Sequence, residues 1–473
     1  MRRLLSIGVA VCALGAVLPR AQTRQPDWPR LEAETLQHFQ ALLKFDTSNP
    51  PGNERLAVDY LKRVFDDAGI ANQIFALDPA RPNIVGRLKG SGARQPILLM
   101  GHTDVVTVDP NKWRFPPFSA TRDGGYVYGR GALDDRPHIV AGLMTMLWLK
   151  RLNVPLDRDV IFLAESGEEG TTRVGIDFMA AQHEADIHAE YCLAEGGESS
   201  RVAGRVRYVG VETTEKVPLP LELTAHGTSG HASIPLLDNP VVHLARAVTA
   251  LGAWQTPIRL NETTREYFRR LAEISSPEDA ARYRAVLTPD SPAAQAADRY
   301  FQEHLPRTAS MLRTSISPTI MNGGYRFNVI PSDAKATIDV RRLPDEDPDA
   351  FIEAVKKVIN DPAVDVTIST AVDARVNGGT TGLSTDAFKA IEAAVTKEYQ
   401  TVTLPIMQTG ATDMSVLRAK GAQCYGVSAA VDIEDGPKGF GAHSDQERIL
   451  ESELHRFVRL EWEIVTRLAA RAQ

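Results

Sequence analysis

The stretch GRGALDDRPHIVAGLMTML, residues 129–147, joins a glycine-rich turn to an apolar segment with helical spacing. Two adjacent carboxylates, Asp134 and Asp135, lie where the turn meets a helix that the spacing predicts over 137–152. The simplest interpretation is a helix N-cap, because Asp is a favoured cap and Pro137 suits a first turn. The alternative is that two carboxylates in so small and apolar a setting are held for cations, since burying them without a counter-charge is costly.

Apolar runs of strand length alternate with helical patterns on both sides of this stretch. Several of these runs are continuous rather than alternating, as expected for strands that are buried on both faces of a sheet. The pattern therefore predicts an α/β fold with a mostly parallel sheet. The predicted strands are 83–88, 96–100, 159–165, 191–194 and 423–428, and the predicted helices are 31–45, 57–68, 137–152, 174–182, 384–399 and a closing helix from about 450.

The pattern changes between about residues 214 and 374. Strands and helices follow there in the order strand, helix, strand, strand, helix, strand, which matches a split βαβ sandwich. We therefore expect an inserted α+β domain at 214–374, which divides the first domain into 23–213 and 375–473. We expect the polar, mostly helical segment 262–309 to extend the inserted domain. The predicted strands here are 219–224, 315–321, 333–340 and 364–369, and the predicted helices are 239–251 and 348–359.

The 473 residues are 43% hydrophobic and 24% charged, an ordinary globular composition that is large enough for two domains. A net charge of −7 and the lack of a basic cluster argue against a nucleic-acid partner. Arg2 and Arg3, followed by the apolar run 4–18, are typical of a signal peptide. We therefore expect residues 1–22 to be removed and the protein to be secreted or periplasmic. A membrane anchor is the less favoured alternative, because the run is short for a span.

Cysteine is rare in this chain, with three residues in all. Cys12 would leave with the signal peptide. Cys192 and Cys424 lie inside apolar, strand-like runs, where cysteines are usually inert core residues. Nothing in the sequence requires a disulfide between them, so we expect two buried core side chains.

Histidines and carboxylates follow the predicted strands at their carboxyl ends, the edge of an α/β sheet where sites form. They are His102 and Asp104 after 96–100, Glu168 and Glu169 after 159–165, and Glu195 after 191–194. His443 lies in a later glycine-rich loop. Each has a simpler explanation when it is taken alone, such as a solvated acidic loop or a surface histidine. Together with Asp134 they offer two imidazoles and three carboxylates as candidate metal ligands, with Asp104 and one of the two adjacent glutamates left for other roles.

Imidazole and carboxylate ligands with one bridging carboxylate suit a pair of Zn²⁺ ions. The lack of cysteine ligands argues against a structural zinc site. A two-metal site lowers the pKa of a water molecule from ~16 to about 7. The residue pair His102 and Asp104 suits a ligand and the group that orients it. Of the adjacent Glu168 and Glu169, one could bind metal while the other faces the substrate and moves a proton.

These residues occur in motifs that resemble the M20 family of metallopeptidases and amidohydrolases, the group that holds carboxypeptidase S, glutamate carboxypeptidase and aminoacylase. The motifs run in family order from about residue 30 to 465, and they are specific jointly rather than singly. They are GHTDVV (101–106), GRGALDD (129–135), GEEG (167–170), AEGG (194–197), HGTSGHAS (226–233), ISPTIMNGGYRFNVIP (316–331), DVRRLP (339–344), GATD (410–413) and GAHSDQE (441–447).

The resemblance implies roles for residues of the first domain. It implies that one zinc is bound by His102 and Glu195, that the other is bound by Glu169 and His443, and that Asp134 bridges both. It makes Glu168 the general base and Asp104 the partner of His102, with a cis peptide bond between Asp134 and Asp135. Co²⁺ and Mn²⁺ are the expected substitutes for zinc. The family usually has Lys-Gly after the paired acids, where this chain has Arg136-Pro137-His138. That departure bears on substrate preference rather than activity, because every expected ligand is present.

The resemblance also implies that the inserted domain is a lid and the surface of a homodimer. His231 matches a lid histidine that reaches the neighbouring subunit's site and stabilises the oxyanion. Asn328 and Arg341 match residues that hold the substrate's carboxylate, and Gly410 matches a turn that lines the pocket. A surface ion pair is the simpler explanation for Arg341, and the adjacent Arg342 is a rival for its role.

We therefore expect a dizinc hydrolase that cleaves an amide bond next to a free carboxylate. A carboxypeptidase acting on short peptides is the first expectation, and an N-acyl-amino-acid amidohydrolase using the same site is the second. A zinc aminopeptidase of another architecture is less favoured, because its sheet lacks the inserted lid. A metal-bearing binding protein without turnover is also less favoured, since a pure binder has no need of Glu168 beside the ligands.

Overall fold

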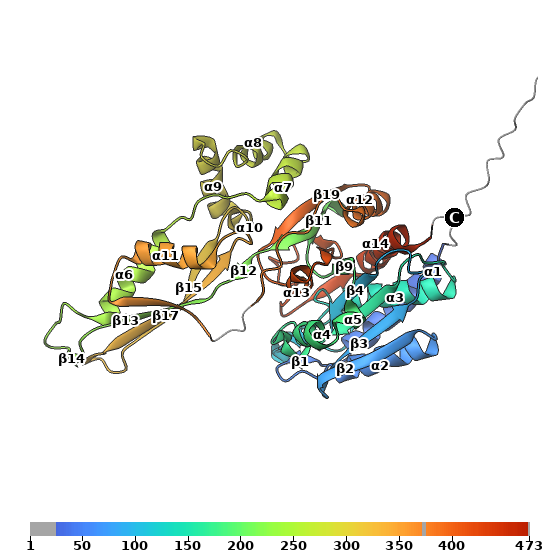
Figure 1. Ribbon diagram of the computed structural model, residues 1–473, viewed down its shortest axis with the longest axis horizontal. Coiled ribbons are helices and arrows are strands. Elements are labelled where there is room, and N and C mark those ends of the chain that lie inside the picture. Colours follow the sequence, from blue (N-terminus) through green and yellow to red (C-terminus); the bar gives the residue numbers. More distant parts are fainter. Residues whose placement is uncertain (1–24, 371–374, 472–473) are drawn as a thin grey trace, which may run out of the picture.

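A computed structural model describes residues 25–370 and 375–471 of the chain. The expected signal peptide at 1–22 lies outside the described residues, and so does the expected domain boundary at 374. Figure 1 shows a larger α/β part and a smaller α+β part, which are joined by the long strand β11 and its continuation β12. In the described part of the chain, no helix combines the length and the apolar character that crossing a membrane requires.

A ten-stranded mixed sheet forms the centre of the larger part. Its middle strands β8, β4, β9 and β20 are parallel, which confirms the predicted parallel sheet at this position. The hairpin β2–β3 adds an antiparallel edge to β8, while β11 is antiparallel to β20 and β10 and parallel to β19. The strands are β2 Ala71–Asp78, β3 Arg81–Leu88, β4 Ile97–His102, β8 Val160–Glu165, β9 Tyr191–Ala194, β10 Glu198–Val202, β11 Arg205–Glu215, β19 Val402–Gln408, β20 Gln423–Gly426 and β21 Val431–Asp432.

Helices cover both faces of this sheet, because successive side chains of a strand point to opposite faces. Along β4, Leu99 packs into the core under α1, α2, α3, α12 and α14, whereas Leu98 and Met100 pack into a second core under α4, α5 and α13. The helices are α1 Trp28–Leu43, α2 Arg55–Asp67, α3 Arg136–Arg151, α4 Ile176–Gln182, α5 Glu184–Ile187, α12 Asp386–Tyr399, α13 Met414–Ala419 and α14 Glu451–Ala469.

The predicted helix after the paired aspartates is α3, and it is buried on all sides. Every residue from 136 to 149 is buried, because the sheet lies on one side of the helix and α1 and α14 lie on the other. A helix so enclosed is a rigid support for the turn that precedes it. Short elements complete this part. Strand β1 Ser48–Asn49 pairs with β5 Val105–Val106. A separate small sheet contains β6 Thr121–Asp123, β7 Tyr126–Tyr128 and β22 Arg448–Leu450, and two 3₁₀ turns are η1 Pro110–Lys112 and η2 Thr172–Val174.

The smaller part has the predicted split βαβ arrangement, with strands in the spatial order β18, β13, β17, β15. Helices α6 and α11 cover one face, and the strands turn small and apolar side chains toward them. We call this part the lid. Its elements are β12 Val217–Pro218, β13 Leu221–His226, β14 Gly230–His231, α6 Pro240–Ala253, β15 Ser315–Gly323, β16 Val329–Ile330, β17 Asp333–Arg342, α11 Pro348–Ile359 and β18 Val364–Ile368.

The helical segment 262–309 packs differently from the expectation that it extends the lid. Its helices are α7 Glu262–Glu273, α8 Pro277–Ala285, α9 Pro292–His304 and α10 Pro306–Ser310. They form a separate core in which Phe268 and Phe301 meet Leu404, Ile406 and other apolar residues of β19 and β11 in the large sheet. The amphipathic pattern correctly indicated helices with an apolar face. That face covers the edge strand β19, so we call 262–310 the edge insertion.

Cys192 and Cys424 form a disulfide, which corrects the expectation of two separate core cysteines. The two residues are direct neighbours on the parallel strands β9 and β20, with Cα atoms 4.4 Å apart. That spacing lies in the range that a disulfide spans. The pairing depends on the register of two strands that are 232 residues apart in sequence, which no local pattern indicates.

Removing this disulfide should lower the stability of the protein. We expect the double variant Cys192→Ala, Cys424→Ala to lose about 2–5 kcal/mol of unfolding free energy, because the cross-link restricts the unfolded chain. Urea unfolding with and without reductant measures the effect: reductant should lower the midpoint of the wild type and leave that of the variant unchanged. Titration of the denatured, unreduced wild type with a thiol reagent is the control, and reactive Cys192 and Cys424 would contradict the cross-link.

Candidate metal centre

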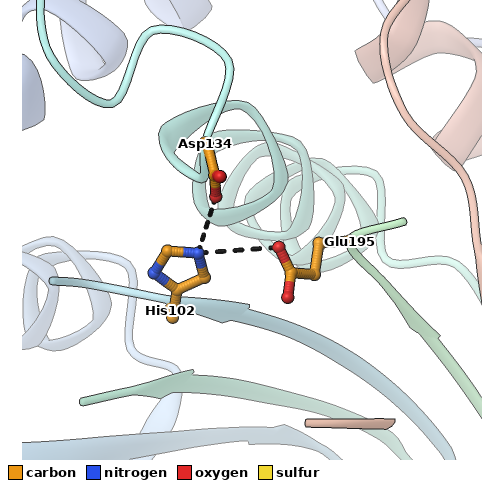
Figure 2. A group of neighbouring side chains, drawn as sticks. All are labelled: His102, Asp134 and Glu195. Carbon is orange, nitrogen blue, oxygen red and sulfur yellow. Dashed lines mark hydrogen bonds and ion pairs between the residues drawn. The ribbon is translucent and has the colours of Figure 1, made fainter. Parts of the chain in front are cut away.

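Two candidate ligand groups share Asp134. In the first group, His102 Nε2 lies 2.9 Å from Asp134 Oδ1 and 3.6 Å from Glu195 Oε2, as Figure 2 shows. His102 ends β4 and Glu195 follows β9, so two neighbouring parallel strands bring them to the same edge of the sheet. In the second group, His443 Nε2 lies 3.0 Å from Asp134 Oδ2 and 2.8 Å from Glu169 Oε1. Each oxygen of Asp134 therefore faces one imidazole.

The ligand atoms of each group lie within 4.8 Å of one another, which suits a bound metal ion. Each group offers one imidazole and two carboxylates, the number of protein ligands that a catalytic zinc site uses while it keeps one position open. These residues fit a pair of divalent ions with Asp134 between them. The structure thus brings together all five residues that the sequence suggested as ligands.

Charge at this centre also favours cations. Burial raises the pKa of Glu195 to about 7. The carboxylates of Asp134 and Glu169, which accept hydrogen bonds from His443, raise the pKa of its imidazole to about 10. Burial opposes a charged His102, but the hydrogen bonds to its carboxylate neighbours prevail and raise its pKa well above the ordinary value. Carboxylates outnumber imidazoles at the centre, so bound divalent cations would offset the excess negative charge.

Glu447 holds the turn that carries Asp134, and sequence reasoning missed it. Its buried carboxylate accepts hydrogen bonds from the backbone N–H groups of Gly131, Leu133 and Asp134 at 3.1, 2.7 and 3.1 Å. Arg130 Nη1 donates to the same carboxylate at 2.7 Å and neutralises it. The only signal in the sequence is that Glu447 ends the motif containing His443, and a glutamate in a loop is ordinarily solvated.

Asp135 holds the backbone of His102. Its Oδ2 accepts a hydrogen bond from the backbone N–H of His102 at 3.1 Å, and its other oxygen bonds His138 Nδ1. The peptide bond between Asp134 and Asp135 is cis, as the resemblance implied. The two neighbouring carboxylates thus point in different directions, one to the ligand groups and one into the sheet.

The residues that replace the usual Lys-Gly are part of this support. Arg136 is buried and donates to Thr103 O at 2.7 Å and to Thr47 Oγ1 at 2.6 Å. Burial lowers the pKa of Arg136 to about 10. Burial also opposes a charged His138, but the nearby carboxylate of Asp135 prevails and raises its pKa to about 9. Arg136 thus bonds the start of α3 to the loops of Thr47 and Thr103, and His138 bonds it to the loop of Val427.

Asp104 connects His102 with the loop that carries both glutamates. Its Oδ1 lies 3.4 Å from His102 Nδ1, as expected for the partner of a ligand histidine. The same carboxylate accepts the backbone N–H groups of Gly167, Glu168 and Glu169 at 2.9, 3.2 and 3.1 Å. Asp104 is fully buried, so this set of hydrogen bonds replaces its hydration and fixes the loop 167–169.

Glu168 lies beside the ligand groups without belonging to either. Its Oε1 accepts a hydrogen bond from Arg375 Nη2 at 3.2 Å, and Arg375 Nη1 donates to Asp413 Oδ1 at 2.5 Å. Burial, together with the charges of Glu195 and Asp413, raises the pKa of Glu168 well above its ordinary value. Sequence reasoning missed Arg375, which lies outside every motif and meets Glu168 only in the folded chain.

The lid residues are placed apart from the ligand groups. His231 in β14 pairs with Val329 in β16, and Asn328 O accepts the backbone N–H of Ala232 at 3.1 Å, so His231 and Asn328 lie near each other. Figure 1 places β14 at the end of the lid farthest from the larger part. Within one chain, His231 and Asn328 are therefore far from Asp134.

The remaining predicted substrate residues lie closer to the junction of the two parts. Arg341 Nε donates to Asp339 Oδ1 at 2.8 Å, so Arg341 takes part in an ion pair at the lid surface. Its rival Arg342 is buried and bonds Glu346 O inside the lid. Gly410 follows β19, in a loop with open space beside its Cα.

A cavity of about 450 Å³ opens beside Asp134 and Glu195. It extends between the loop after Glu195 and the loops that follow β20 and β21. Its position next to the ligand groups makes it the space for one part of a substrate.

Comparisons with known proteins agree with this geometry. The model of peptidase family M20/M25/M40 matches residues 98–467. The N-fatty-acyl-amino acid synthase/hydrolase PM20D1 of Xenopus tropicalis is 28% identical over 334 residues, which cover 67% of this chain and 62% of that protein. A probable succinyl-diaminopimelate desuccinylase of Staphylococcus aureus is 27% identical over 338 residues, which cover 70% of this chain and 74% of that protein.

Among solved structures, the M20 family metallo-carboxypeptidase Sso-CP2 from Sulfolobus solfataricus has a similar fold. The TM-score is 0.67 at 21% identity, and the match covers 91% of this chain and 98% of that one. This likeness confirms the predicted combination of an α/β part with an inserted α+β domain.

The bridging position of Asp134 leads to a prediction about metal content. Asp134→Asn should lose both ions, because the change removes the charge that both ligand groups share. Asp432→Asn is the matched control, since Asp432 lines the same cavity but belongs to neither group. Elemental analysis after zinc loading and desalting measures the bound metal, with circular dichroism as the check on folding. Retention of both ions by folded Asp134→Asn would contradict the shared role.

Proposed function

The chain belongs to peptidase family M20/M25/M40, and from this premise we propose that it is a dizinc hydrolase that cleaves an amide bond next to a free carboxylate. Our first assignment is a carboxypeptidase acting on short peptides. The observation that supports it is a pair of ligand groups sharing Asp134, with Glu168 beside them but outside both. A protein that only bound metal would have no use for a carboxylate in that position.

The residues divide the reaction among them. Divalent ions held by the two ligand groups would supply Lewis acidity toward the carbonyl and lower the pKa of a water molecule. Glu168 takes a proton from this water as the water oxygen bonds the carbonyl carbon, and gives it to the nitrogen as the carbon–nitrogen bond breaks. Arg375 holds Glu168 by a hydrogen bond of 3.2 Å and so fixes its orientation. The products are a carboxylic acid and a free amine.

A second assignment, an N-acyl-amino-acid amidohydrolase, uses the same residues. It is favoured by the relatives whose names describe hydrolysis of N-acyl compounds, and by the cavity beside Glu195, which has room for an acyl group. In both assignments Asn328 and Arg341 hold the carboxylate of the released residue, and the turn at Gly410 lines the pocket.

We also propose a homodimer formed through the lid. Strand β15 lies at an edge of the lid sheet, where its unpaired backbone can meet another strand. The large apolar side chains exposed around this edge and at the tip of the lid are Ile234, Leu237, Ile320, Met321, Tyr325 and Phe327. Exposed apolar patches of this kind are a feature of interaction surfaces. A dimer of this kind would let His231, remote from Asp134 of its own chain, serve the partner's centre.

Export of the protein is the third element of the proposal. The basic and apolar pattern of residues 1–22 supports it. The disulfide between Cys192 and Cys424 supports it as well, because disulfides persist mainly in oxidising compartments.

The proposed chemistry predicts the outcome of a substrate test. The zinc-loaded protein should release free amino acid from dipeptides or N-acyl amino acids, and much less from the same compounds with the terminal carboxylate capped as an amide. Glu168→Gln should keep its metal and lose about 10²–10⁴-fold in kcat, the contribution of a general base. Loss of zinc from this variant would mean that Glu168 is a ligand. No turnover of any amide by the wild type would reject the proposed function.

The dimer predicts complementation between inactive chains. His231→Ala and Glu168→Gln should each be inactive alone, and a mixture should recover activity because one centre of the mixed dimer has both an intact base and an intact partner histidine. Tagged chains purified in two steps verify the exchange. A mixture of His231→Ala with His231→Asn is the control that cannot recover. A verified mixed dimer that stays inactive would assign His231 to its own subunit.

A further inference from the structure

The edge insertion contributes one side chain to the cavity beside the metal centre. Arg307, in the short helix α10, lines this cavity together with Gln408 and Glu198. Arg307 Nη2 donates to Gln408 Oε1 at 2.8 Å, and Arg307 Nη1 lies 3.2 Å from Glu198 Oε2. The apolar core between the insertion and β19 fixes the position of α10, and Gln408 ends that same strand.

Asp432 and Asp435 also line the cavity, but each pairs with an arginine that is not among the lining residues. Arg201 Nη1 lies 3.1 Å from Asp432 Oδ2, and Arg448 Nη2 lies 2.7 Å from Asp435 Oδ1. The Arg307–Glu198 pair differs, because its side chains are 49% and 35% exposed and a pair so open to water contributes little. A guanidinium has five N–H donors, and these two contacts leave others for a ligand.

The cavity suits the acyl part of a substrate. Asn328 and Arg341, which we assign to the carboxylate of the released residue, are not among its lining residues, whereas the ligands Asp134 and Glu195 are. The wall of the cavity is partly apolar and fits methylene groups, with Leu133, Ala429, Val431, Ile433 and Ala442 among its residues. Arg307 lines the same cavity of about 450 Å³ as the ligands Asp134 and Glu195, so an acyl group that fills this cavity brings its far end to the guanidinium.

We propose that Arg307 determines acyl specificity by binding a carboxylate at the far end of the acyl group, so that half-amides of short dicarboxylic acids are preferred substrates. This inference rests on the proposed amide hydrolysis. Arginine matches a carboxylate with two parallel hydrogen bonds, and the exposed Glu198 returns to water when the substrate replaces it. Selectivity for the acyl end thus comes from the edge insertion, while the chemistry stays with the metal centre.

Two acyl groups of equal length test the assignment. N-glutaryl and N-pentanoyl derivatives of one amino acid differ only in the terminal carboxylate. For the zinc-loaded wild type we expect the glutaryl compound to have the higher kcat/KM. In Arg307→Met the ratio of the two values should fall about tenfold, the effect of one charge-assisted contact at a partly exposed site. In Glu198→Gln the ratio should rise, because Arg307 loses its competing partner.

Arg299→Met is the matched control, because it removes one exposed arginine from the same insertion at a position away from the cavity. It should leave the ratio unchanged. Inhibition by free glutarate and pentanoate is a second readout, and glutarate alone should weaken in Arg307→Met. Equal losses for both substrates in that variant, or equal kcat/KM values in the wild type, would overturn the assignment of Arg307. If the wild type hydrolyses dipeptides but neither compound, the assignment of Arg307 is overturned and the proposed function stands. If it hydrolyses no amide at all, the proposed function is overturned as well.

Discussion

The interaction on which the centre depends is the contact of one carboxylate, Asp134, with two imidazoles. To face His102 with one oxygen and His443 with the other, the side chain must leave a tight turn at a fixed angle. Such a turn exposes backbone N–H groups that have no partner in a helix or sheet, and leaving them buried and unpaired would be costly. Glu447 accepts three of them, and Arg130 balances its charge. The metal centre is therefore supported by a second buried carboxylate that binds no metal.

The same principle organises the glutamate loop. Parallel strands end at one edge of the sheet, which brings His102 and Glu195 within reach of each other, but the loop after β8 must be fixed separately. Asp104 does this by accepting three backbone N–H groups of residues 167–169 while facing His102. Because Asp104 contacts both the candidate ligand His102 and the loop of Glu168, a shift of either would disturb the other. The positions of the first ligand group and of Glu168 are thus mechanically linked.

The sequence predicted what depends on local pattern and on topology. Continuous apolar runs located the central strands, and the carboxyl ends of those strands located His102, Glu168, Glu169 and Glu195. It did not predict Glu447 or Arg375, because each acquires its partner only through contacts across more than 200 residues. The disulfide was missed because it depends on strand register. The edge insertion was misplaced, because an amphipathic helix shows that it has an apolar face but not which surface will cover that face.

The placement of the edge insertion has a consequence for how this architecture varies its substrates. Its helices rest on β19, an edge strand, and their contribution to the cavity is the side chain of Arg307. Changes in the insertion can therefore alter the far end of the cavity while the ligand groups keep their geometry. The lid differs from the insertion, because β14, which carries His231, lies at the end of the lid farthest from the larger part. Under the proposed function, recognition of the acyl end is built into a fixed surface, whereas the proposed role of His231 requires movement of the lid or a second chain.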